Sequence, residues 1–205
     1  MKRPLSFSAT AIRAAGMICL LAGMVLLAVP HLATAQTTKS WAAAADGAWS
    51  DPSKWVPAGV PGVSDQVEIS ATGASYTVTL EGAVSVAKLT NGSSSTFLVN
   101  GNPAKGNALL RGANGIINAG TLRLQSSGGA QASSILLTGG DLVNTGALQV
   151  KPASGGQRLI TADLNNQGQV QISAPLSFNK ARAVYANTGI WNIAPGQTLS
   201  ITSGN

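Results

Sequence analysis

The sequence predicts an all-β protein built as a single-stranded parallel β-helix, or β-solenoid, and three observations lead to this prediction. A nine-residue phrase centred on Asn-x-Gly occurs four times, with its Asn residues 26, 22 and 21 positions apart, which is typical of stacked repeats. The second half of each phrase alternates apolar and polar residues, as a strand with one buried face does. No run between phrases has a helical pattern. The phrases occupy residues 116–124, 142–150, 164–172 and 185–193.

Each phrase predicts a corner followed by a strand. Asn and Gly tolerate a positive φ angle, so Asn-x-Gly favours a turn between strands. In a solenoid, equivalent residues of neighbouring coils lie about 4.8 Å apart, so the Asn side chains can form a hydrogen-bonded ladder. The side chains expected to point inward are Leu122, Leu124, Leu148, Val150, Val170, Ile172, Trp191 and Ile193.

An antiparallel sandwich is the alternative architecture. It would need two-residue hairpin signals at short, regular intervals. The sequence instead places Gly/Ser/Ala-rich stretches once per repeat, at residues 126–134 and 152–157, as a solenoid places its insertions. This spacing favours the solenoid.

Residues 1–35 have the pattern of a secretory signal peptide with a helical apolar core. Lys2, Arg3 and Arg13 supply positive charge, an uncharged apolar run follows at 14–29, and the small residues at 33–35 form an Ala-x-Ala cleavage site. The apolar run is shorter than the roughly 20 residues of a membrane-spanning helix. We therefore expect an exported protein with no permanent transmembrane helix after cleavage.

Loss of this leader would change which chemistry the chain can perform. Ten of the 13 basic residues remain against seven acidic ones, in no cluster, so nucleic acid is not an expected partner. Cys19 and His31, the only residues of their types, also lie in the leader. The remaining chain has no Ser-His-Asp or Cys-His machinery, no typical zinc ligands and no disulfide, and we expect no cofactor.

Residues 36–66 are expected to form an N-terminal Trp/Pro/Gly-rich cap. They hold three of the four tryptophans, Trp41, Trp49 and Trp55, among turn-forming residues. The first coil of a solenoid must be covered because it exposes an apolar core and strand edges. The alternative is that these indole rings are exposed platforms for glycans.

This segment also carries a resemblance. The run W-S-D-P-S-K-W at residues 49–55, followed by G-V-P-G at 59–62 and D-Q-V-E-I at 65–69, resembles the start of exported bacterial β-solenoid proteins. These are the autotransporter-type passengers and related surface proteins. The resemblance covers residues 41–205 and implies a solenoid at the outer membrane surface. It does not imply one activity, because the group includes adhesins and matrix proteins.

Residues 67–205 are expected to form the coils. Strand-like runs lie at 67–69, 76–80, 84–89 and 97–99, and Asn91-Gly92 is a degenerate copy of the repeated corner. The chain closes on a strand-like run at 198–202. We expect these residues to be the N-terminal part of a longer protein. The rest of that longer chain is therefore expected to accompany them.

Asp141 and Asp163 are the strongest candidates for chemistry. Each lies three residues before a repeat Asn, so the two should stack about 5 Å apart on successive coils, near the carboxylate spacing of retaining glycosidases. The alternative is that both are solvated turn residues. The same pair, or Asp46 with Asp51, is a weak calcium candidate, because two carboxylates are few for calcium.

The expected function is therefore binding, by a secreted or cell-surface solenoid of adhesin-like or matrix type. Its uncharged polar surface suits multivalent contact with extracellular glycans or other cells. Two alternatives remain open: a polysaccharide-degrading β-helix hydrolase or lyase, and an inert stem for a module beyond residue 205.

Overall fold

A computed structural model describes residues 36–152 and 155–202. The predicted signal peptide at 1–35 lies outside the described residues. Of the described residues, 55% are in strands and 2% in helix, and they form a parallel β-solenoid of about six turns. Among the described residues, no helical segment is long and apolar enough to cross a membrane.

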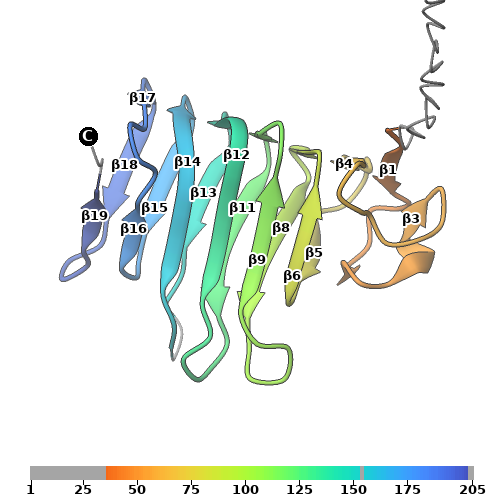
Figure 1. The fold of residues 1–205 in the computed structure, drawn as a ribbon, viewed down its shortest axis with the longest axis horizontal. Helices are drawn as coiled ribbons and strands as arrows, with labels where there is room; N and C mark the ends of the chain where they lie inside the picture. The colour runs from red at the N-terminus through yellow and green to blue at the C-terminus, as the bar shows by residue number, and fades with distance from the viewer. Residues whose placement is uncertain (1–35, 153–154, 203–205) are drawn as a thin grey trace, which may run out of the picture. The chain divides into compact units, whose positions relative to one another are not determined.

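Each complete coil has three extended segments, so the solenoid has three faces, along which strands of successive coils lie side by side (Figure 1). Faces 2 and 3 belong to one sheet because β12 and β14 run through both. Face 1 consists of β2 (Gly47–Ala48), β5 (Tyr76–Leu80), β8 (Ser95–Gly101), β11 (Thr121–Ser126), β13 (Ala147–Val150), β15 (Gln169–Ile172) and β18 (Ile190–Ile193). Face 2 consists of β6 (Ala83–Val86), β9 (Ala108–Gly112), the first parts of β12 (Ser133–Asn144) and β14 (Arg158–Asn166), β16 (Leu176–Phe178) and β19 (Leu199–Ile201). Face 3 consists of β1 (Thr38–Trp41), β4 (Gln66–Ile69), β7 (Lys88–Asn91), β10 (Ile116–Asn118), the second parts of β12 and β14, and β17 (Tyr185–Asn187).

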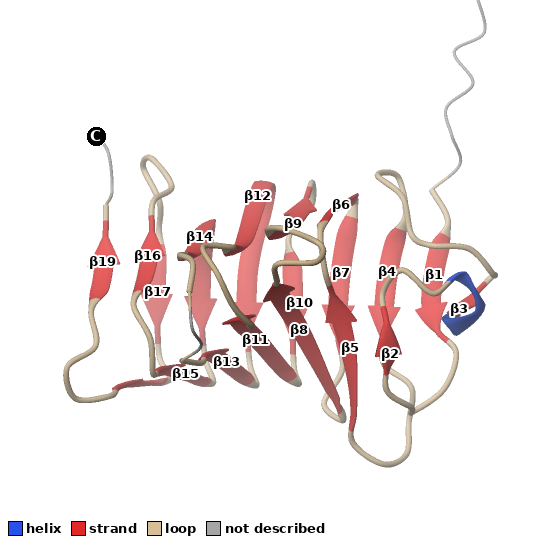
Figure 2. Cartoon of the chain, turned by 90° about the horizontal axis from the view of Figure 1, so that it is seen from below, coloured by secondary structure: helices blue, strands red, loops and turns tan. Residues whose placement is uncertain are grey.

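The stacking follows the predicted register. Leu122 lies beside Leu148, and Leu148 lies beside Val170, in parallel pairs along face 1. Figure 2 shows the strands of this face following one another from β2 to β15, and β18 pairs with β15 at the end of the row. The pairing between the main coils is parallel throughout, which confirms the solenoid and excludes the antiparallel sandwich. Because side chains alternate along each strand, the apolar half points into one shared core.

The Asn residues of the corner form the predicted ladder inside this core. Asn91, Asn118, Asn144 and Asn166 have no exposed surface. In each case one amide hydrogen is donated to the Oδ1 atom of the next Asn, at 2.7 Å for the first three steps and 2.6 Å for the step to Asn187. The same amide groups of Asn118 and Asn144 also donate to the main-chain carbonyls of Ala147 and Gln169.

Both ends of this ladder are hydrogen-bonded. At the first rung, the hydroxyl of Ser95 donates to Asn91 Oδ1 at 2.6 Å. At the last rung, the indole N–H of Trp191 donates to Asn187 Oδ1 at 2.8 Å. Buried amides are costly unless their hydrogen bonds are made, so this chain of bonds favours one register for every coil.

The residues that precede the first complete coil form both strands and a cover. β1 and β2 extend faces 3 and 1. After the short 3-10 helix η1 (Pro52–Lys54), β3 (Trp55–Val56) returns antiparallel to β1. The ring of Trp49 lies between the cover and the core of the coils. Its centroid is 4.9 Å from the ring centroid of Trp55 and 5.5 Å from that of Phe97.

The last described coil differs from the others in exposure. Ile193, predicted to point inward, is 47% exposed, although Ile172, its register partner in the preceding coil, is buried. Ile190, which pairs with Gln169, is 56% exposed. Trp191, predicted to point inward, is half-buried and packs near Phe178. The predicted inward side chains of the three earlier phrases are all buried.

Replacing Asn144 with Ala tests the ladder. The change leaves the Asn118 amide and the Asn166 oxygen buried without these partners, so the free energy of unfolding should fall by about 2–5 kcal/mol. Denaturant unfolding of the purified chain, followed by circular dichroism, measures this. The matched control is Asn165→Ala, on the outer side of the neighbouring strand β14, which should change stability by about 0.5 kcal/mol at most. If the two substitutions lowered the free energy of unfolding equally, the Asn ladder would contribute no particular stability.

Candidate functional site

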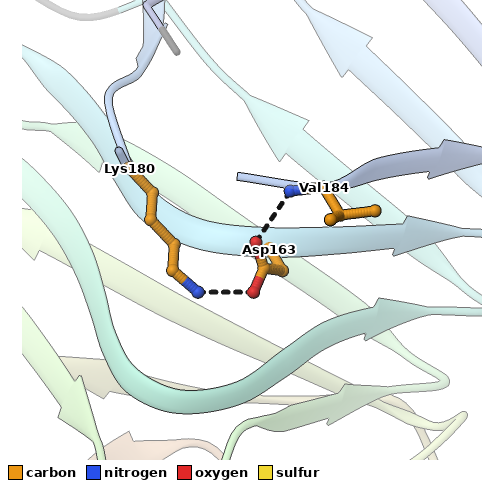
Figure 3. A network of polar contacts seen from close by, with 3 residues as sticks. All are labelled: Asp163, Lys180 and Val184. Carbon is orange, nitrogen blue, oxygen red and sulfur yellow. Dashed lines mark hydrogen bonds and ion pairs between the residues drawn. The ribbon is translucent and has the colours of Figure 1, made fainter. Parts of the chain in front are cut away.

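The two candidate carboxylates lie beside each other, as their spacing predicts. Asp141 on β12 is in register with Asp163 on β14. Their surroundings differ, because Asp163 is engaged by the following coil. Lys180 forms an ion pair with its Oδ2 atom, and the main-chain N–H of Val184 donates to its Oδ1 atom at 2.8 Å (Figure 3).

These contacts determine how Asp163 ionises. The hydrogen bond from Lys180, together with that from Val184, holds the pKa of the Asp163 carboxyl below its usual value. A general acid in catalysis needs the opposite shift, toward neutral pH. Asp163 therefore ties the bend before β17 to β14. Asp141 is exposed, and within the described part of the chain its side chain makes no hydrogen bond or ion pair.

The calcium candidates do not gather into one site. Within residues 36–152 and 155–202, no group of three or more His, Cys, Asp or Glu side chains is placed to hold a metal ion. Asp51 accepts hydrogen bonds from the N–H and hydroxyl of Ser53, which hold its pKa below the usual value, and so begins η1. Asp46 accepts from the N–H of Thr77 at 2.6 Å. Asp51 thus caps η1, and Asp46 joins the segment before β2 to β5.

The three tryptophans of the predicted cap face the core. Trp41, Trp49 and Trp55 are 3%, 1% and 1% exposed. The indole N–H of Trp41 donates to the carbonyl of Ala45, and that of Trp55 donates to the carbonyl of Trp49. No ring face is left at the surface for a sugar to stack on.

A surface groove lies over the Asn-x-Gly corners. It has a volume of about 630 Å³ and crosses four successive coils. Its floor is the backbone of Gly120, Gly146, Gly168 and Gly189. A Cβ atom at any of these glycines would lie 2.1–2.2 Å from a carbonyl oxygen of the preceding coil, so only glycine lets the corners stack this closely.

The walls of this glycine-floored groove are polar and uncharged. Thr145, Gln167 and Thr188, each between the Asn and the Gly of a corner, form one exposed wall. Thr121 and Gln169, which follow a corner glycine, stand on the other side. No Asp, Glu, Lys or Arg lines the groove.

A second hollow of similar volume lies on the outer side of face 1. Asp46, Thr77, Glu81 and Arg123 are among its lining residues. The guanidinium of Arg123 donates to Gln149 Oε1 at 3.0 and 3.2 Å. Its side chain therefore lies along the sheet, toward the neighbouring coil. The carboxylate of Asp46 is already bonded to Thr77, as described above. Unlike the groove, this hollow is lined in part by charged side chains.

Sequence reasoning identified the corners but not the groove. The signal is present, because the Gly of every phrase falls at the same register position and an uncharged residue precedes it. What the repeat could not reveal was that the surface over the four corners forms one continuous hollow.

Comparison of the chain with known proteins finds no matching family model, curated protein or solved structure. The resemblance to exported bacterial solenoids therefore depends on the motifs of this sequence, and the functional argument depends on the geometry described above.

Replacing Asp163 with Asn tests its structural role. A carboxylate whose pKa is lowered on folding stabilises the protein above its unfolded pKa, and this stabilisation is lost as the pH falls through the lower folded value. The variant should lose about 1 kcal/mol at pH 7, and the difference from the parent chain should disappear at strongly acidic pH. Thermal unfolding across pH measures this. In the control, Asp141→Asn, an exposed carboxylate without a side-chain partner is replaced, and stability at pH 7 should change by about 0.5 kcal/mol at most. A pH-independent loss in Asp163→Asn would show that the charge is not involved.

The close approach of the coils is tested by replacing Gly146 with Ala. The added methyl group would collide with the main-chain oxygen of Gly120, so the coils must separate and the protein should lose several kcal/mol of stability or fail to fold. Gly62→Ala is the control, because its Cβ would contact only Asp65 Oδ2 at 3.7 Å. Soluble yield and melting temperature measure the difference. Similar values for both variants would mean that the corners are looser than described.

Proposed function

We propose that this chain is an exported bacterial β-solenoid, secreted or held at the outer membrane surface, which acts by binding as an adhesin-like or matrix protein. The observation that carries the proposal is the glycine-floored groove, which presents similar uncharged polar groups on four coils in succession. A repeated array of weak sites gains avidity from each additional contact, without any single strong one.

The character of the surface supports binding. Only 10% of residues are charged, and the outward positions of the strands hold Ser, Thr, Asn and Gln in large numbers. Such side chains both donate and accept hydrogen bonds, as sugar-rich surfaces do. Extended faces of this kind suit broad, shallow contact better than capture of one small molecule, which needs an enclosed pocket.

Export is supported by composition and by how the fold is stabilised. Residues 1–35 have the n-region, apolar run and small-residue site of a signal peptide. The described part contains no Cys, and the Asn ladder with the stacked apolar core performs the stabilising role that disulfides have in many secreted domains.

A polysaccharide hydrolase or lyase is the second candidate, favoured by the register pairing of Asp141 with Asp163. It is the weaker one, because Asp163 is bonded to Lys180 and its pKa is shifted away from the range of a general acid. Catalysis by this pair would require that ion pair to open.

The proposed function is tested by binding of the purified chain to glycan arrays and to whole cells. The chain is offered singly and clustered on beads. Clustering should raise retention by two or more orders of magnitude, as expected for weak multivalent contact. The same samples are assayed for release of reducing ends or unsaturated products from a polysaccharide panel, where none is expected.

Each result of this experiment has one meaning. Retention without product supports binding. Product that disappears in Asp141→Asn and Asp163→Asn would replace the proposal with the enzyme. Absence of both, in a chain with an intact circular dichroism spectrum, would leave the inert stem as the function.

A further inference from the structure

We propose that the glycine-floored groove binds a linear, uncharged polysaccharide lying along the stacking direction of the coils. This inference rests on the proposed function as a binding protein, and adds to it the place of binding and the chemical class of the ligand.

The absence of charge in the groove determines the class of ligand. None of its lining residues carries a charge. An anionic or cationic polymer would lose water on entering the groove and gain no opposite charge there. Nucleic acid and charged polysaccharides are therefore poor ligands, whereas a neutral chain loses nothing of this kind.

The main chain of the floor is already hydrogen-bonded, and this disfavours a peptide. The N–H groups of Thr145 and Gly146 both donate to the carbonyl of Asn118, and the carbonyl of Gly146 accepts from Gln169. The corners before and after repeat this arrangement. An extended peptide binds through hydrogen bonds to free main-chain groups. Here these N–H and carbonyl groups already bond to the neighbouring coils, so a peptide would find no partners.

The side chains of the wall retain hydrogen-bonding capacity that suits sugar hydroxyls. The Thr145 hydroxyl donates to the carbonyl of Asn118 at 3.3 Å, which leaves its oxygen free to accept. The Gln167 amide donates to Asn165 at 3.3 Å and keeps its own carbonyl oxygen as an acceptor. Both residues are exposed, and they occupy the same position on neighbouring coils.

The repeat of the coils explains why the ligand should be a chain. The four corner glycines are separated by three steps of about 4.8 Å, so the groove extends over roughly 15 Å. No aromatic ring lines it, so each sugar contributes little affinity by stacking. Affinity should therefore grow with the number of sugars bound and stop growing once the ligand spans the coils.

The experiment measures binding of purified chain to neutral, anionic and cationic polymers. The probes are β-1,4-glucan, β-1,3-glucan, mannan and galactan, with polygalacturonate and chitosan as charged comparisons. At least one neutral polymer should bind, and its oligomers should show affinity that rises with length to a plateau. Raising the salt from 50 mM to 500 mM should change this affinity less than twofold, because no charges meet.

A double variant locates the site. Thr145→Ala with Gln167→Ala removes two wall groups without touching the floor or the core, and should weaken binding about tenfold. The matched control is Ser134→Ala with Ser177→Ala, which removes two outward hydroxyls from face 2 and should leave binding unchanged. Melting temperatures verify that all variants are folded.

The outcomes separate this inference from the proposed function. Equal binding by both double variants would overturn the groove as the site, and preferential binding of a charged polymer would overturn the ligand class. A chain that is retained on cells but binds no neutral polymer would also overturn the inference, and would leave the proposed function standing. A chain that binds neither cells nor glycans would refute both.

Discussion

The ladder of buried Asn amides is the constraint on which the rest of this structure depends. Four fully buried amides, at positions 91, 118, 144 and 166, are linked head to tail across successive coils. A slip of one coil by a single residue would turn an Asn outward and place an outward side chain in the core. The apolar stack supplies the driving force for compaction, but it is tolerant of exchange among Leu, Val and Ile. The Asn amides can be displaced only by losing their buried hydrogen bonds, so they determine the register of the coils.

Much of the surface follows from this ladder. Because each Asn bonds to the next, the corners that follow are held at one height and must be built from glycine to avoid the coil below. The corner glycines lie in one row along the stack, and the residues on either side of them form the walls of a continuous groove. The same stacking that stabilises a chain without disulfides thus creates the repeated polar surface to which we assign binding.

The repeats predicted the coils, the inward side chains of the complete coils and the Asn ladder, because a period in the sequence becomes a period in space. The ladder begins one coil earlier than the four phrases, at Asn91 of the degenerate corner. Two features could not be predicted this way. The run at 84–89 is two strands separated at Ala87, since a bend between faces has no strong signal of its own. The ion pair and hydrogen bond of the Asp163 carboxylate are made with Lys180 and Val184, which lie outside the repeated phrase. Spacing placed the two aspartates together, but it could not say which groups would surround them.

The most direct test of this account is hydrogen exchange of the Asn side-chain amides, measured by NMR of the purified chain. The amide protons of Asn118, Asn144 and Asn166 should exchange far more slowly than those of Asn114, which is exposed. They should also show contacts to the Asn of the neighbouring coil. Side-chain amides that exchange as quickly as that of Asn114 would contradict the ladder, and with it the register of the solenoid.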